Sequence, residues 1–224
     1  MRFEGKQVGV TGAAGNLGRA VACAFATEGA GLVLLDRIPA RLEGVEAESR
    51  VVDLSDAAAT RDVFAGLAPL DVLCNVAGGF AMGTPVHETT AEDWERMLDI
   101  NARTMLNCVR AAVPAMLANG GGAIVNVGAR AALAGSANMG PYVAAKSIVV
   151  RATESMAAEL KDRGIRVNCV LPSALDTPEN RAAMPNADRS KWVEPAALAA
   201  VILFLASPAA RAVHGAAIPV TGLG

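Results

Sequence analysis

The only tyrosine in the chain, Tyr142, stands four residues before Lys146. The apolar pattern around the pair predicts a long helix over Tyr142–Asp162, ended by Gly164, so both side chains lie on one helix face. A phenol normally titrates near ~10 and is a poor base at neutral pH. A neighbouring ammonium favours the phenolate and lowers that pKa. The pair could then exchange a proton with a substrate oxygen, although this spacing on its own is more often a surface pair.

A glycine-rich segment joins the first predicted strand, Gln7–Thr11, to a predicted helix, Leu17–Glu28. Glycines let the backbone turn tightly and approach a phosphate, and the helix N-terminus presents free N–H groups and the positive end of its dipole. Three glycines alone are a weak signal, but the order of strand, glycines and helix strengthens it. We therefore expect contacts to a dinucleotide from Gly12, Gly15, Asn16, Leu17 and Gly18.

An acidic residue, Asp36, follows the second predicted strand, eighteen residues beyond Gly18. A carboxylate at that place can accept hydrogen bonds from an adenosine ribose and would repel a 2′-phosphate. The glycine-rich segment contains no basic residue, which also favours NAD(H) as the cofactor. Arg37 keeps NADP(H) open as the alternative, because a guanidinium beside the ribose could bind a phosphate.

Short apolar runs rich in Val, Ile and Leu alternate with longer segments of helical periodicity. Such runs are typical of buried parallel strands, and the alternation predicts an α/β sheet with right-handed crossovers. The predicted strands are Gln7–Thr11, Gly31–Leu35, Arg50–Asp53, Leu70–Asn75, Ala123–Val127, Ile165–Leu171 and Ala216–Val220. Further helices are predicted over Ala57–Leu67 after the N-cap Asp56, over Ala91–Ala118 after Thr90, and over Pro195–Ala206.

Three places depart from this regular pattern. Pro114 is expected to bend the helix over Ala91–Ala118 or to start a new turn in it. The segment Arg37–Ser49 is brief and charged, which leaves little room for a helix. The segment Pro172–Trp192 carries three prolines with polar residues between them, and a loop of that length is usually functional. We expect a substrate lid around residues 173–192.

Composition argues against several classes of function. The formal net charge is −2 and the pI is about 5.7, so no broad electrostatic surface for nucleic acid or a membrane is expected. The longest uncharged stretch, Ala111–Ala129, is interrupted by Pro114 and by Gly120–Gly122, unlike a membrane helix. Four widely spaced cysteines and two histidines predict neither a metal site nor a disulfide framework. The first residues lack the apolar region of a signal peptide, so we expect a cytoplasmic protein.

Six motifs taken together resemble the short-chain dehydrogenase/reductase family over nearly the whole chain. Each motif alone is modest, whereas all of them in order and at the family's spacing are highly specific. They are the segment 11–18, Asp53-Leu54, Asn75-Val76-Ala77-Gly78, Asn101, Tyr142-x-x-x-Lys146 and Leu171–Thr177. The resemblance implies an NAD(P)-dependent oxidoreductase in which residues 1–224 form a single α/β domain. That domain would be a Rossmann fold, a doubly wound seven-stranded parallel sheet with helices on both faces.

The same resemblance implies roles for individual residues. Asn101 would support a water molecule in a proton relay beside Tyr142, and Lys146 would also hold the nicotinamide ribose. The other cofactor-binding residues that it implies are Asp53 and Leu54 by the adenine, Asn75, Ala77 and Gly78 along the cofactor, Pro172 at the end of the sixth predicted strand, and Leu175 and Thr177 by the carboxamide.

Three positions depart from the family pattern. Asn16 stands where the compact members of the family have the middle glycine, and Ser173 replaces the glycine after Pro172. The third departure is Ala129, thirteen residues before Tyr142, where the family has its catalytic serine. A methyl group cannot hydrogen-bond a reacting carbonyl, and losing such a donor typically costs a factor of ~10² or more in rate.

One branch of the family, the quinoid dihydropteridine reductases, also lacks that serine. The segments 128–135 and 175–192 are similar to the corresponding stretches of that branch, as is Val76-Ala77-Gly78-Gly79-Phe80. The likeness is local and covers about a third of the chain. Asn75 and Asn101 oppose it, because they are typical of the general family.

The sequence therefore leaves three functions open. The first is hydride transfer between a nicotinamide cofactor and a small pterin-like or quinonoid substrate. The second is a general carbonyl, alcohol or 3-oxoacyl reductase, against which Ala129 counts. The third is a dinucleotide-binding sensor or structural protein with little activity. The family also commonly pairs its two long helices about a two-fold axis, so we expect a homodimer or homotetramer.

Overall fold

The computed structural model describes residues 1–222, and its strands form one parallel sheet. The sheet has seven strands in the order β3-β2-β1-β4-β5-β6-β7, which confirms the expected doubly wound α/β fold. The strands are β1 (Gln7–Thr11), β2 (Gly31–Asp36), β3 (Glu48–Val51), β4 (Val72–Asn75), β5 (Gly122–Val127), β6 (Ile165–Pro172) and β7 (Ala217–Val220).

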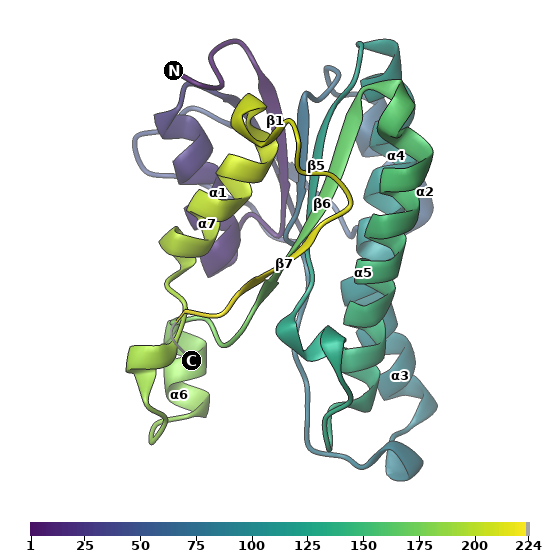
Figure 1. The fold of residues 1–224 in the computed structure, drawn as a ribbon, viewed down its shortest axis with the longest axis vertical. Coiled ribbons are helices and arrows are strands. Elements are labelled where there is room, and N and C mark those ends of the chain that lie inside the picture. Colours follow the sequence, from purple (N-terminus) through teal and green to yellow (C-terminus); the bar gives the residue numbers. More distant parts are fainter. Residues whose placement is uncertain (223–224) are drawn as a thin grey trace.

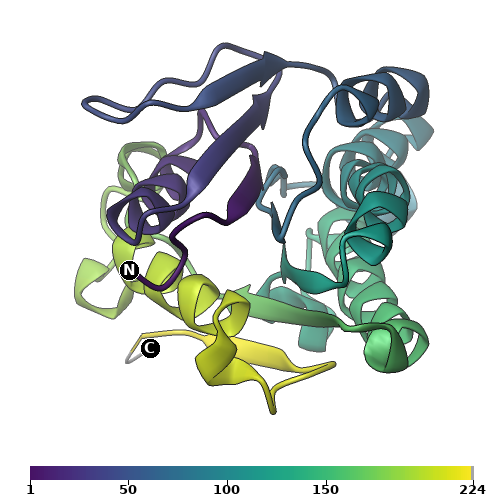
Figure 2. The same ribbon diagram turned by 90° about the horizontal axis from the view of Figure 1, so that it is seen from above.

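Helices cover both faces of the sheet (Figures 1 and 2). One face carries α1 (Asn16–Thr27) and α7 (Pro195–Ala206), which pack against each other. The other face carries α2 (Ala57–Ala65), α4 (Thr104–Ala118) and α5 (Gly140–Leu160). Two further helices, α3 (Ala91–Leu98) and α6 (Pro178–Ala183), extend beyond the sheet at the end where α5 begins (Figure 1).

The continuous apolar runs are explained by the two cores that the sheet separates. In β2, Leu32 and Leu34 pack into the core beneath α1 and α7, whereas Val33 and Leu35 pack into the core beneath α2, α4 and α5. Alternate residues of a strand point to opposite faces, so a strand covered on both sides is apolar at most positions, with exceptions such as Asn126, whose side chain is hydrogen-bonded. This is why the central strands were recognisable from composition alone.

Local signals placed most helix ends correctly. The Asp56 carboxylate accepts hydrogen bonds from the N–H groups of Ala58 and Ala59 at 2.8 and 3.0 Å, and so caps α2. The Thr90 hydroxyl accepts one from the Asp93 N–H at 3.1 Å and caps α3. After α5, Gly164 takes a left-handed conformation with φ +77°, which lets the chain turn into β6.

The helix expected over Ala91–Ala118 contains an irregularity that the sequence did not predict. Pro114 lies inside α4 without ending it, and the irregularity is a π-helical turn over Asp99–Arg103. A π turn leaves carbonyl groups outside the regular bonding pattern and is frequent at functional sites. The turn contains Asn101, so the distortion lies at a predicted site residue.

The sheet edge and the lid also differ from expectation. β3 spans Glu48–Val51 instead of Arg50–Asp53, because this exposed edge strand lacks the apolar run that marks a buried one. The connection 37–47 carries no helix, as its length predicted. The irregular segment 173–192 contains the short helix α6 and a 3₁₀ turn over Arg189–Lys191. No helix within residues 1–222 is long and apolar enough to cross a membrane.

Candidate active site and dinucleotide cleft

The glycine-rich loop after β1 packs too closely for side chains at two of its glycines. Gly12 has φ +64°, and a Cβ placed there would lie 2.8 Å from the backbone of Ala77. A Cβ on Gly18 would overlap the carbonyl oxygen of Gly12. The N-cap of α1 is Gly15, which has no side chain to cap the first N–H groups of the helix. The loop therefore presents backbone donors at a helix N-terminus, which fits the diphosphate of a dinucleotide.

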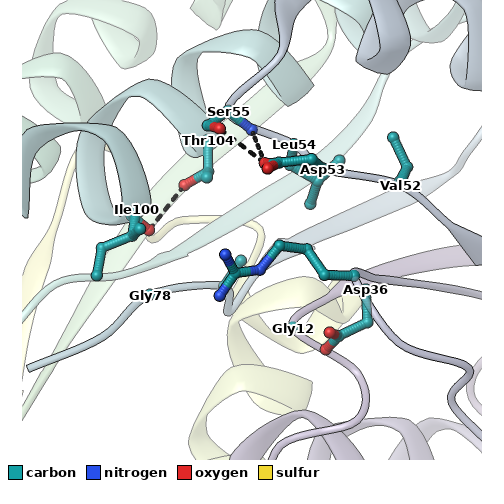
Figure 3. Close-up of a pocket in the computed structure, with 11 residues that line it drawn as sticks. Gly12, Asp36, Val52, Asp53, Leu54, Ser55, Gly78, Ile100 and Thr104 are labelled. Carbon is teal, nitrogen blue, oxygen red and sulfur yellow. Dashed lines mark hydrogen bonds between the residues drawn. The ribbon is translucent and has the colours of Figure 1, made fainter. Parts of the chain in front are cut away.

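A pocket opens beside this loop at the carboxyl ends of β1, β2 and β4 (Figure 3). Asp36 lies at its edge, where the carboxylate accepts hydrogen bonds from the N–H groups of Ala14 and Ile38 at 3.0 and 3.3 Å. The pocket is lined by Gly12, Asp36, Arg37, Val52, Asp53, Leu54, Ser55, Ala77, Gly78, Ile100 and Thr104. The structure thus brings six of the predicted cofactor residues together around one opening.

The wall of the pocket opposite Gly12 is held by residues of two elements. The Asp53 carboxylate accepts hydrogen bonds from the N–H and the hydroxyl of Ser55 at 2.9 and 2.7 Å, which lowers the pKa of Asp53. Asn107, buried on α4, donates to the carbonyl groups of Leu54 and Ser55 at 2.9 and 3.1 Å. Sequence reasoning missed Asn107, because a polar residue within a helix gives no signal of a distant partner.

Lys146 lies buried at the inner end of the cleft. Its ammonium donates a hydrogen bond to the carbonyl oxygen of Val127 at 2.9 Å. Gly78 approaches so closely that a Cβ there would lie 3.2 Å from Lys146 Nζ and 2.7 Å from Asn101 Oδ1. Glycine is needed at position 78 because the lysine and the asparagine converge on it.

Asn101 is fixed by the loop that follows β4. Its Oδ1 accepts a hydrogen bond from the Gly79 N–H at 3.1 Å, and its Nδ2 donates to the carbonyl groups of Gly79 and Met97 at 2.9 and 3.1 Å. Both Nδ2 hydrogens are thereby used, and Oδ1 keeps one lone pair that can accept a hydrogen bond from a water molecule.

Tyr142 lies in the first turn of α5, where its ring meets Phe80. The two ring centroids are 4.9 Å apart with an interplanar angle of 87°, an edge-to-face contact. Burial raises the pKa of Tyr142 to about 12. This corrects the expectation that Lys146 lowers that pKa, because in the structure the desolvation of the phenol outweighs any attraction from the lysine, whose hydrogen bond goes to Val127. At neutral pH the phenol is thus protonated and suited to donate.

Burial also shifts the titration of Lys146 and makes the stability of the fold depend on pH. Its pKa falls to about 8 from 10.5, because the folded protein desolvates the ammonium. Between these values the unfolded chain binds more protons at Lys146, so the contribution of this residue to the free energy of unfolding should rise with pH by at most about 1.4 kcal/mol per pH unit. Burial raises the pKa of the Cys74, Cys108 and Cys169 thiols, which act in the opposite direction in both proteins. Urea denaturation from about pH 7 to about pH 10 should therefore show the free energy of unfolding of the parent rising relative to that of Lys146→Met. Equal pH dependence in both proteins would contradict the assignment.

Ala129 is buried at the end of β5, and its φ and ψ of −157° and 151° are ordinary extended values. Its carbonyl oxygen accepts a hydrogen bond from the Ala132 N–H at 3.0 Å, which starts a short 3₁₀ turn. The position therefore presents a methyl group in unstrained backbone. Serine also adopts these backbone angles.

A chain of buried polar side chains fixes β4, β5 and α5 to one another. Asn75 donates to Asn126 at 2.9 Å, and Asn126 donates to Thr153 on α5 at 2.9 Å. Thr153 lies two helical turns beyond Lys146, so these bonds set the position of α5 against the sheet. The Oδ1 atom of Asn75 is buried without a partner among the described residues.

The predicted lid residues occupy the chain beyond β6. Pro172 is the last residue of β6 and is paired with Val220 of β7. Leu175 forms an isolated bridge with Val193, and the Thr177 hydroxyl accepts a hydrogen bond from the Asn180 N–H at 3.2 Å, which caps α6. The sequence signal for Thr177 as a cofactor residue is thus equally a helix-capping signal.

Comparisons with known proteins agree on the family. The short chain dehydrogenase profile matches residues 6–188. Meso-2,3-butanediol dehydrogenase from Serratia marcescens is 35% identical and galactitol 2-dehydrogenase from Rhizobium johnstonii is 33% identical; each alignment covers at least 98% of this chain and 95% of the relative. The solved structure of levodione reductase superposes with a TM-score of 0.92 at 29% identity, covering 99% of this chain and 98% of that one.

The named relatives bear on the expectations in two ways. Their substrates, by name, are a diol, a sugar alcohol and levodione, so they give no support to the expected likeness to dihydropteridine reductases. The family profile matches most of the chain, and the two relatives are more than 30% identical over nearly its full length. Both findings agree with the six sequence motifs that resemble this family. The chain belongs to the short-chain dehydrogenase/reductase family of NAD(P)-dependent oxidoreductases.

Proposed function

We propose that the protein is an NAD(H)-preferring oxidoreductase that interconverts a small alcohol and the corresponding carbonyl compound, with Tyr142 as the proton carrier. The observation that carries the proposal is the convergence of Lys146 and Asn101 on Gly78, in the cleft whose other end is the glycine-rich loop. Lys146 and Asn101 lie at the same edge of the sheet as the dinucleotide-binding loop. This arrangement supports hydride transfer within a single cleft.

Tyr142 and Lys146 have different roles in the proposed reaction: Tyr142 carries the proton, and Lys146 supplies a stabilising charge. A bound nicotinamide supplies or accepts the hydride. The Tyr142 phenol, with its pKa raised to about 12, keeps its proton at neutral pH. It can donate that proton to the carbonyl oxygen of the substrate when the carbonyl group is reduced. Lys146 is largely charged at neutral pH, because its pKa is about 8, and its ammonium stabilises the phenolate left after that transfer.

The preference for NAD(H) is supported by Asp36. The carboxylate lies at the pocket edge, and its two backbone bonds hold it beside the glycine-rich loop. Replacing Asp36 with alanine should remove the repulsion of a 2′-phosphate and leave Arg37 to bind it, so the preference should shift toward NADPH by about tenfold. Calorimetric titration of both cofactors into the parent and Asp36→Ala measures the shift. Tighter NADPH binding by the parent would refute the preference.

The matched control for that experiment is Arg37→Ala. It should weaken the NADPH affinity gained in Asp36→Ala when the two changes are combined, since the guanidinium is the group expected to take the phosphate. If the double variant keeps the full gain, Arg37 does not contact the 2′-phosphate. The two residues would then have to be assigned separate roles.

A second candidate function is reduction of a flat conjugated acceptor, such as a quinonoid pterin. It is favoured by two features, the methyl group of Ala129 and the contact of the Phe80 ring with Tyr142. Ala129 offers no hydroxyl to a carbonyl, and the Phe80 ring, 55% exposed, gives the site an aromatic wall. A ring that reacts through a conjugated imine needs a stacking surface more than a carbonyl donor.

A single screen separates these candidates from a binding protein without catalysis. Purified protein is assayed with both cofactors against secondary alcohols, polyols, the matching ketones and a quinonoid dihydropterin. Turnover of alcohols and ketones supports the first candidate, and turnover of the dihydropterin alone supports the second. Cofactor binding without turnover of any substrate would support a sensor or structural role.

The expected homodimer or homotetramer stays a prediction. Leu106 on α4 and Ile148 on α5 are exposed apolar side chains on the helices that such pairing would cover. Light scattering on the purified protein measures the oligomeric state directly.

A further inference from the structure

One hydrogen bond joins α1 to the segment 173–192 across a long separation in sequence. Asn16, the first residue of α1, donates through Nδ2 to the Glu179 carboxylate at 2.7 Å, although the residues are 163 positions apart. Glu179 lies in the first turn of α6, within the lid expected around residues 173–192. Among the side-chain hydrogen bonds of residues 1–222, this is the one that connects α6 to the glycine-rich loop.

Further hydrogen bonds hold Glu179 and the helix α6 in place for this bond. The Glu179 carboxylate also takes hydrogen bonds from its own N–H and from Thr177, and all three bonds lower its pKa. Asn180 donates to the carbonyl of Leu175 at 2.8 Å, and Arg181 pairs with Asp176, so α6 is fastened to the end of β6. The helix is thus anchored on one side, and Asn16 supplies the contact on the other.

Asn16 is also the position where this chain departs from the compact members of its family, which have a glycine there. A glycine has no side chain to reach the lid, so the departure itself creates the contact. We propose that Asn16 and Glu179 form a latch that holds α6 against the N-terminus of α1 and retains a dinucleotide bound in the cleft. The proposal rests on the dinucleotide binding described above.

The latch predicts changes in the rate of cofactor release. Asn16→Gly and Glu179→Ala should each raise the dissociation rate of NADH about threefold to tenfold, measured by stopped-flow fluorescence with an excess of NAD⁺ as trap. Glu179→Gln should stay within about twofold of the parent, because a glutamine oxygen still accepts from Asn16. The double variant Asn16→Gly/Glu179→Ala should be no faster than the single ones, since both remove the same bond.

Hydrogen exchange of the cofactor-free protein tests the latch without catalysis or ligand. The amides of residues 178–183 should exchange faster in Asn16→Gly and Glu179→Ala than in the parent and in Glu179→Gln. Unchanged exchange and release rates in the two latch variants would overturn the proposal. Tighter NADH binding in both Glu179→Ala and Glu179→Gln would also overturn it, because the carboxylate would then compete with the diphosphate.

The two proposals fail in different ways. A parent protein that binds neither NADH nor NADPH refutes the proposed function and the retention of cofactor, whereas the exchange comparison still decides whether the bond holds α6. Normal cofactor binding with no effect of either latch variant refutes the latch alone.

Discussion

Tyr142→Phe should lower kcat by about a thousandfold and leave the Kd of NADH nearly unchanged. The phenylalanine ring preserves the volume of the tyrosine and its edge-to-face contact with Phe80. The one group removed is the hydroxyl, which acts mainly in the transition state. Steady-state kinetics with any substrate found in the screen, together with NADH titration, measures both quantities.

The matched comparison is Lys146→Met, which should weaken NADH binding as well as kcat. Lys146 is the residue assigned both to the phenolate and to the nicotinamide ribose, so its loss affects two steps. If Tyr142→Phe kept most of the parent's kcat, Tyr142 would not be the proton carrier. A shared loss of NADH affinity in both variants would instead indicate damage to the fold of α5.

Ala129→Ser should raise kcat/KM toward simple ketones and alcohols by a factor of ~10², the usual contribution of one donor to a developing oxyanion. The backbone at this position is extended and unstrained, and a serine can adopt it. On a quinonoid acceptor the same hydroxyl would meet no matching oxygen, and its activity should stay level or fall.

The control is Ala131→Ser, which adds a hydroxyl to the same 3₁₀ turn at a position not assigned to the reacting group. It should leave the activity on every substrate within about twofold, the usual range for a neutral surface change. A gain from Ala129→Ser on ketones supports the carbonyl site. No gain, combined with dihydropterin turnover by the parent, would replace the first candidate by the second.

The sequence predicted those features that local rules govern. The glycine-rich loop follows from the conformations that only glycine tolerates at Gly12 and Gly18. The α5 helix, with Tyr142 and Lys146 one turn apart, follows from helical periodicity and from the left-handed stop at Gly164. The central strands follow from burial on both faces, which favours apolar residues at most positions.

Other features depended on contacts that no local pattern encodes. The π turn around Asn101 leaves the apolar periodicity of the helix almost unchanged, so the sequence pointed to Pro114 and gave no sign of this turn. The raised pKa of Tyr142 follows from tertiary burial, whereas the sequence shows only the neighbouring lysine. The bond between Asn16 and Glu179 needs the whole sheet to bring its partners together.

The most direct test of the account is transfer of deuterium to a substrate from NADH that carries deuterium at both C4 positions. The labelled cofactor is incubated with the parent protein and the acceptor panel, and the products are examined by NMR and mass spectrometry. We predict one deuterium in the reduced product, on the carbon that accepted the hydride, and about a thousandfold slower labelling with Tyr142→Phe. Tight NADH binding with no deuterium in any product, and no oxidation of any alcohol by NAD⁺, would contradict the account and leave a dinucleotide-binding protein without this chemistry.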